Sequence, residues 1–102
     1  MNRQQRTVGA VRDEILAAVA ELRAVARSEQ DQQRTNVADR LDRQFAGVTD
    51  RRVLREAARN GLTLYQGGSG SFRDVGSESS SHAVNRLRIA LRHGRSWFIR
   101  NS

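Results

Sequence analysis

The chain has 102 residues and a net charge of +7, and it contains no cysteine, no proline and no lysine. Its length fits one domain over residues 1–102, and with 37% apolar and 5% aromatic residues that domain can have only a modest core. The missing cysteine excludes disulfides, thiol catalysis and a cysteine-ligated zinc site, and no apolar run is long enough to span a membrane. We therefore expect a cytoplasmic protein.

The first predicted element is an amphipathic helix that begins near residue 8. Its apolar side chains recur every three or four residues and form one stripe: Val8, Val11, Ile15, Val19, Leu22 and Ala26. Residues 27–36 are polar, and the stripe resumes over 37–45. Because residues 10–46 contain neither glycine nor proline, the sequence favours one long helix with a solvated middle. The alternative is a second helix that begins at Thr35 or Asn36, either of which can act as an N-cap.

The apolar stripe can pack either against a second copy of the chain or against another part of the same chain. A helix of this length cannot bury its whole apolar face on so small a core, and a heptad-like stripe is typical of an oligomer interface. One interpretation is therefore a homo-oligomer through Val8, Val11, Ile15, Val19 and Leu22. The other is that the stripe packs on the C-terminal half of the same chain.

A short middle helix is expected over residues 50–60. Thr49 or Asp50 can cap its first turn. Gly61 is expected in the left-handed conformation after the last turn. A brief extended piece over 62–65 follows.

The remaining elements are a glycine-rich loop and a final helix. Residues 67–71 read Gly-Gly-Ser-Gly-Ser, and Ser80 or Ser81 can cap a helix that ends at Gly94. Residues 97–99 are expected to pack back on the core. The predicted fold class is therefore mainly α: a long N-terminal amphipathic helix, a short middle helix, a glycine-rich loop with at most a trace of β, and a C-terminal helix.

The net charge lies entirely in the second half of the chain. Residues 1–50 hold eight arginines and eight acidic residues, whereas residues 51–102 hold ten arginines and three acidic residues, which accounts for the whole +7. We interpret residues 1–48 as a neutral N-terminal helical arm and 49–102 as a basic part that contacts an acidic partner. An all-arginine composition is also typical of a GC-rich bacterial genome, so codon bias contributes to the excess.

Six arginines form two basic stripes, one on each C-terminal helix. Each triplet recurs at helical spacing on one side of its helix: Arg52, Arg55 and Arg59, then Arg88, Arg92 and Arg95. A guanidinium group suits bidentate contact with phosphate or carboxylate. Phosphate contacts by five or six of these residues predict a log–log salt slope of about −5 for the affinity. The alternative is that both stripes are ordinary solvated helix faces.

The glycine-rich loop is a second candidate site. Its backbone N–H groups can turn toward a phosphate beside Arg73, and Gly67, Gly68 and Gly70 permit such a turn. The loop has neither a Walker A nor a dinucleotide-binding pattern, however. The structural interpretation is a tight turn in which at least one glycine has positive φ and Phe72 is anchored in the core.

The other reactive side chains indicate neither a metal site nor catalysis. His82 and His93 lie on the same side of the final helix but about 16 Å apart along it, too far to share a metal. No nucleophile elbow presents any of the serines. We therefore expect no metal, no cofactor and no enzymatic activity; a reaction on a phosphorylated small molecule at the glycine-rich loop is the alternative.

One segment resembles a known family. Residues 64–75 read Leu-Tyr-Gln-Gly-Gly-Ser-Gly-Ser-Phe-Arg-Asp-Val, and Leu87 and Leu91 follow on a helix. This resembles the G-G-x-G-S-F-x-D segment of a family of small uncharacterised bacterial proteins, a domain of unknown function, in which a helix leads into the segment and a leucine-rich helix follows. The resemblance covers roughly residues 50–95. It implies a defined turn and a bacterial source, and it implies no particular activity.

These patterns lead to two hypotheses about function. The first is a non-enzymatic binding module whose arginine-rich C-terminal half contacts an acidic partner, with nucleic acid preferred over an acidic protein. The second is a protein–protein interaction module, such as an antitoxin, an immunity protein or a phage-derived adaptor, that uses the N-terminal amphipathic helix. The sequence does not distinguish DNA from RNA.

Overall fold

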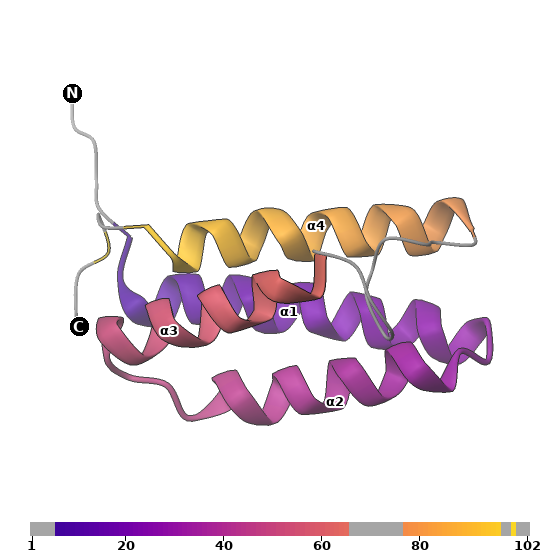
Figure 1. Cartoon of the computed structure of the whole chain (residues 1–102), viewed down its shortest axis with the longest axis horizontal. Helices are drawn as coiled ribbons and strands as arrows, with labels where there is room; N and C mark the ends of the chain where they lie inside the picture. Colours follow the sequence, from indigo (N-terminus) through magenta and orange to yellow (C-terminus); the bar gives the residue numbers. More distant parts are fainter. Residues whose placement is uncertain (1–5, 66–76, 97–98, 100–102) are drawn as a thin grey trace.

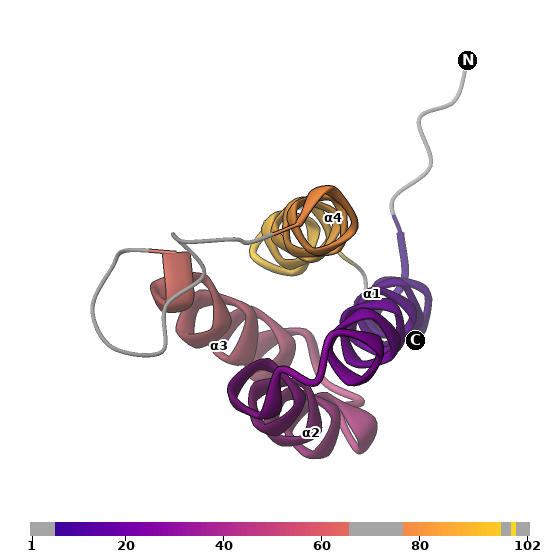
Figure 2. The same ribbon diagram turned by 90° about the vertical axis from the view of Figure 1, so that its right-hand side faces the viewer.

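The computed structural model describes residues 6–65, 77–96 and 99 of the chain. In order, the elements are α1 (Val8–Ser28), α2 (Gln32–Ala46), α3 (Arg51–Leu62), the 3₁₀ turn η1 (Thr63–Tyr65) and α4 (Glu78–Gly94). The described residues form no β-strand, so the predicted mainly α fold class is confirmed. Consecutive helices run in opposite directions (Figure 1), and the four helices surround one core (Figure 2).

The prediction of a single helix over 10–46 is wrong, because a tight turn separates α1 from α2. α1 ends in a Schellman motif, in which Gln30 has a positive φ of 56° and the Asp31 N–H donates to the Ala26 carbonyl (2.7 Å). No other non-glycine residue of the described part has positive φ. Glycine usually takes this left-handed position, so a sequence without glycine there carries no sign of the helix end.

Asp31 begins α2 as its N-cap. Its carboxylate accepts from the Arg34 N–H (3.0 Å) and contacts the Arg34 guanidinium (2.7 Å between Oδ2 and Nη1). The backbone N–H of Arg34, ahead of its side chain, stabilises the ionised form and lowers the pKa of Asp31 below its ordinary value. Thr35 and Asn36, the alternative helix starts, both lie inside α2 and are wrong as N-caps.

The turn folds α2 back along α1, and polar contacts tie the two helices together. The Arg23 Nε of α1 lies 2.9 Å from the Asp39 Oδ1 of α2, and its Nη2 lies 3.6 Å from the Asp42 Oδ2. Near the other end, Arg12 Nη1 donates to the Val48 carbonyl (2.9 Å). The carboxylates of Asp39 and Asp42 therefore stabilise the α1–α2 hairpin by pairing with an arginine of the same chain.

α3 begins as predicted and ends later than predicted. Asp50 is its N-cap and accepts from the backbone N–H groups of the second and third helical residues. Gly61 is a buried residue inside α3, without positive φ, so its predicted left-handed position is wrong. The extended piece expected over 62–65 is also wrong, because the chain continues into η1.

α4 begins one turn earlier than predicted. Ser77 is its N-cap and accepts from the Ser80 N–H (2.9 Å), so the expected caps at Ser80 and Ser81 are wrong. The predicted end at Gly94 is confirmed. Ile99 is 4% exposed and packs on the core, as expected for residues 97–99; its neighbours 97–98 lie outside the described residues.

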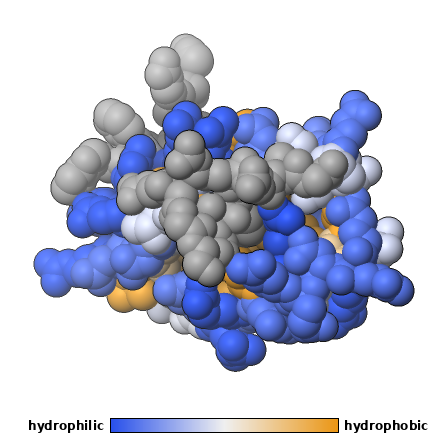
Figure 3. Space-filling view, turned by 45° about the vertical axis from the view of Figure 1, so that its right-hand side comes forward, coloured by the Kyte–Doolittle hydropathy of each residue, from blue (hydrophilic) through white to orange (hydrophobic). Residues whose placement is uncertain are grey.

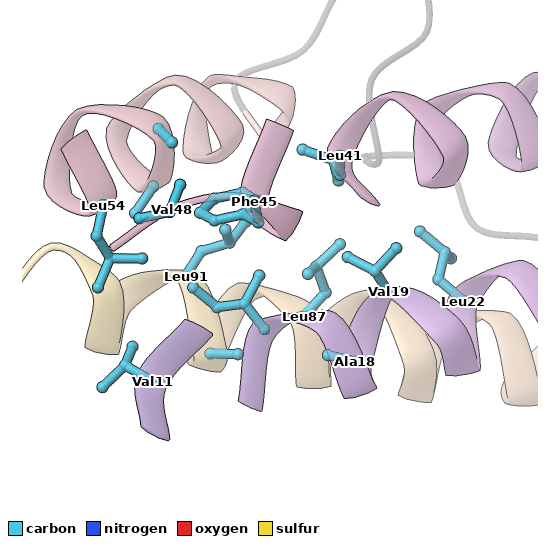
Figure 4. Close-up of a cluster of buried hydrophobic side chains, with 14 of the residues drawn as sticks. Val11, Ala18, Val19, Leu22, Leu41, Phe45, Val48, Leu54, Leu87 and Leu91 are labelled. Atoms are coloured by element: carbon cyan, nitrogen blue, oxygen red, sulfur yellow. The ribbon is translucent and has the colours of Figure 1, made fainter. Parts of the chain in front are cut away.

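All four helices contribute large apolar side chains to the core (Figure 4). Val11 and Leu22 of α1, Phe45 of α2, Leu54 of α3 and Leu91 of α4 are each fully buried. Full burial of such a side chain stabilises the fold by roughly 1.5–3 kcal/mol. The core therefore joins both halves of the sequence.

The apolar stripe of α1 lies inside this core. Each of the five residues expected at an oligomer interface is at most 1% exposed within one chain: Val8, Val11, Ile15, Val19 and Leu22. α1 packs against α2 on one side and α4 on the other. The homo-oligomer interface through this stripe is therefore not supported. The stripe packs within the same chain, on α2 of the N-terminal half as well as on α4 of the C-terminal half.

Candidate functional site

α3 and α4 lie side by side and run in opposite directions (Figure 1). Their backbones approach closely, since a Cβ added at Gly61 of α3 would lie 3.2 Å from both Leu91 methyl groups of α4. Past the end of α3, the Tyr65 hydroxyl donates to the Val84 carbonyl (2.7 Å). These contacts fix the register of the two helices and hence of the side chains that they carry.

One flank of α4 faces α3 and carries the first arginine row. The Arg88 guanidinium lies 5.9 Å from the centre of the Tyr65 ring, which follows α3 in the chain. Arg92 and Arg95 follow Arg88 at spacings of four and three residues, so they share this flank. All three side chains are exposed.

The adjoining flank of α3 carries the second row. Arg51 identifies this flank, because its Nη1 lies 3.5 Å from the carbonyl oxygen of Ile99, just beyond α4. Arg55 follows four residues later on this flank, and Arg59 and Arg52 lie toward its outer edge. Arg52 and Arg59 are exposed, and Arg55 is half-buried.

The two predicted stripes therefore occupy neighbouring flanks of adjacent helices. We name this set the arginine surface: Arg52, Arg55, Arg59, Arg88, Arg92 and Arg95. Spacing within each helix predicted the two rows separately. Only the packing of α3 on α4 brings them to one side of the molecule.

The other flank of α4 faces α1 and is neutralised by carboxylates. Two glutamates of α1 each contact one arginine and one histidine: Glu14 contacts Arg6 and His93 (2.7 Å to Nδ1), and Glu21 contacts Arg86 and His82 (4.0 Å to Nε2). These contacts were not predicted from the sequence. The available signal was the spacing of seven residues between the glutamates, which places them in one row of α1.

Four members of the arginine surface lack such neutralisation. Within the described part of the chain, no carboxylate forms an ion pair with Arg52, Arg59, Arg92 or Arg95. α3 and α4 each contain a single acidic residue. Among the described residues, these four arginines of α3 and α4 therefore present their guanidinium groups to solvent on adjoining helix flanks.

Two members of the arginine surface also contribute to the fold. Arg88 Nη2 donates to the Asn85 Oδ1 (3.0 Å), and its charge lies over the Tyr65 ring. Burial raises the pKa of Tyr65 above its ordinary value, with the Arg88 charge opposing that rise, so the hydroxyl stays protonated and donates to the backbone. Arg55 is half-buried beside the core. The freely exposed members are Arg52, Arg59, Arg92 and Arg95.

The other predicted candidates differ in what the structure shows. The two histidines, His82 and His93, contact α1 glutamates and lie apart, and the described residues contain no group of three His, Asp or Glu side chains that could hold a metal.

A recess beside the α1–α2 turn is lined by Ala26, Arg27, Gln30, Gln32, Thr35 and Asp39. Its one carboxylate already contacts Arg23.

The glycine-rich loop lies outside the residues that the structure describes. Gly67, Gly68, Gly70 and Arg73 lie outside the described residues, as does Phe72. The phosphate-binding and tight-turn interpretations of this segment both stay predictions.

The visible face in Figure 3 is mainly hydrophilic, and its apolar areas are small and separate. In the described part of the chain, Val53 and Ile89 are the large hydrophobic residues that are exposed, at 48% and 46%. No described helix is both long enough and apolar enough to cross a bilayer. Comparison with protein families, curated proteins and solved structures found no match to this chain.

Proposed function

We propose that this chain is a non-enzymatic, cytoplasmic binding protein whose arginine surface contacts nucleic acid. The observation that carries the proposal is the placement of Arg52, Arg59, Arg92 and Arg95 on adjoining helix flanks, exposed and without a carboxylate partner among the described residues. On the α1-facing flank of α4, by contrast, Glu21 pairs with Arg86.

Guanidinium chemistry supports a phosphate ligand. Each exposed arginine presents a planar fork of N–H donors that matches two phosphate oxygens. Binding to a nucleic acid releases condensed counterions, which provides a sequence-independent driving force. Because rigid helices hold the side chains, little ordering of the backbone is needed on binding.

Burial of the apolar stripe of α1 supports this proposal over the alternative that uses the N-terminal helix. Its residues are buried against α2 and α4, so they are unavailable to a partner protein in the folded chain. An acidic protein that binds the arginine surface is the remaining competitor. Titration of a labelled DNA duplex distinguishes an acidic protein partner from nucleic acid.

The test is fluorescence anisotropy of a labelled 20-bp DNA duplex titrated with the full chain at several salt concentrations. Four phosphate contacts predict a log–log salt slope of about −3.6. Arg92→Glu combined with Arg95→Glu should lower the affinity for all sequences alike and reduce the slope by about 2, because phosphate contacts carry no sequence information.

The matched control is Arg27→Glu combined with Arg43→Glu, which changes the net charge equally on α1 and α2, where both side chains are exposed. This double variant should retain most of the affinity. Equal losses in the two double variants would show that only the overall charge matters and would overturn the proposed surface. Absence of binding at 50 mM salt would overturn the nucleic-acid proposal and favour an acidic protein.

A further inference from the structure

We propose that the arginine surface fits the major groove of B-form DNA, with α3 inside the groove and α4 over one of the bordering phosphate strands. The proposal rests on the proposed function, and it adds which duplex is bound and which helix enters it. Three features of α3 support it: the exposure of its outer row, its dimensions beside α4, and the chemistry of Glu56.

The outer row of α3 consists of polar side chains, all of them exposed. They recur at spacings of four and three residues, opposite the buried Leu54: Arg52, Glu56 and Arg59. α3 packs mainly against α4 and lies at one corner of the bundle (Figure 2). This row is therefore accessible to a ligand that surrounds the outer face of the helix.

The dimensions of α3 and α4 match a groove and its border. α3 has 12 residues, and a helix with its side chains is about 10–12 Å across, which fits a major groove about 12 Å wide. The axis of a packed neighbouring helix lies about 8–10 Å away. With α3 in the groove, the α4 row lies beside it, over the phosphates of one strand.

Glu56 distinguishes groove insertion from contact with phosphates alone. It is exposed and lies in the same row as Arg52 and Arg59. Facing a phosphate strand, its carboxylate would repel the ligand. Facing base edges, it can accept a hydrogen bond from the cytosine amino group. A carboxylate between two arginines therefore suits the floor of a groove better than a phosphate strand.

An RNA duplex provides the first test, because the major groove of A-form RNA is deep and narrow and side chains cannot read it. A 20-bp DNA duplex and an RNA duplex of the same sequence are titrated with the full chain at 50 mM salt. We expect DNA to bind at least tenfold more tightly. Equal affinities would overturn groove insertion and leave the proposed function standing, whereas binding to neither duplex would overturn the proposed function itself.

Selection from a pool of random DNA duplexes provides the second test. The wild-type chain should enrich a C·G pair at one position, and Glu56→Gln should lose that preference by about tenfold, in line with one base contact. The control is Glu78→Gln, which makes the same charge change in the first turn of α4 and should keep the preference. Groove insertion is overturned by a uniform rise in affinity for Glu56→Gln, or by a wild-type pool without a preferred base.

Discussion

Gly94 of α4 and Ala58 of α3 approach so closely that a Cβ added at Gly94 would lie 2.9 Å from the Ala58 Cβ. The same Cβ would lie 3.1 Å from the Ile15 Cδ1 of α1. Three helices therefore meet at Gly94, which is buried at the end of α4. The absence of a side chain there permits the spacing between α3 and α4 on which the arginine surface depends.

Gly94→Ala should lower the free energy of unfolding by about 1–3 kcal/mol, because the added methyl group overpacks a crowded part of the core. Urea denaturation followed by circular dichroism measures the change. Gly47→Ala is the matched control: its Cβ would meet no atom within 4 Å, so a change within about 0.5 kcal/mol is expected. Equal stabilities for the two variants would contradict the close approach at Gly94.

Asp31→Ala should lower the free energy of unfolding by about 0.5–2 kcal/mol, because α2 loses its N-cap and Arg34 loses its carboxylate partner. Asp13→Ala serves as the comparison, since Asp13 is 70% exposed and caps no helix. Thermal denaturation of both variants measures the difference. If Asp13→Ala were as destabilising as Asp31→Ala, the cost would reflect charge and the capping role would be wrong.

Acid pH should remove part of the contribution of Asp31. Its folded pKa is lowered below the ordinary value of an aspartate, so ionisation of this carboxyl favours the folded state. That contribution is complete above the unfolded pKa and is lost as the pH falls through the folded pKa. The stability difference between wild type and Asp31→Asn should therefore be constant from about pH 5 to 7 and shrink below about pH 4. A difference that grew on acidification would contradict the lowered pKa.

Ile15→Asp should unfold the chain, because it buries an unpaired carboxylate at a position that is 0% exposed. Circular dichroism should show loss of cooperative unfolding, whereas Ile15→Val should retain the fold with a cost of about 0.5–1.5 kcal/mol. Sedimentation run in parallel gives the oligomeric state. A helical Ile15→Asp monomer formed from a wild-type dimer would restore the oligomer interpretation of the α1 stripe.

The mainly α fold and the buried side of α1 could be predicted because both depend on local spacing. Apolar residues at intervals of three and four place Val11 and Ile15 on one side whatever they pack against. The Asp50 cap also follows from local chemistry. These features need no knowledge of the neighbouring helices.

The break at Gln30 could not be predicted from local spacing. A glutamine there has no intrinsic preference for the left-handed conformation, and the turn is stabilised by the Asp31 cap and by packing of α2 on α1. Gly61 is the opposite case. Glycine is typical of helix ends, but Gly61 lies within α3, where a side chain would contact the Leu91 methyl groups closely. In both places tertiary packing outweighs local propensity.

The candidate site could be predicted only in part. Periodicity places the arginines in two rows, yet it does not tell which flank of α4 faces α3 and which faces α1. The contacts of Glu14 and Glu21 with one flank, and of Tyr65 with the other, provide that information. The local charge depends on this assignment, because carboxylates neutralise one flank and leave the other positive.

α4 consequently lies between α1, whose glutamates attract its basic side chains, and α3, whose arginines repel them. Ionic strength therefore has opposite effects on these two sides of α4. Added ions weaken the attraction of Glu21 of α1 for Arg86. They also relieve the mutual repulsion of the guanidinium groups that α3 and α4 hold together. The Debye length falls from about 30 Å at 0.01 M to about 10 Å at 0.1 M, so both effects develop over the same range of salt. Rising salt therefore weakens the electrostatic attraction between α1 and α4, and it stabilises the packing of α3 on α4 by screening the repulsion between their arginines.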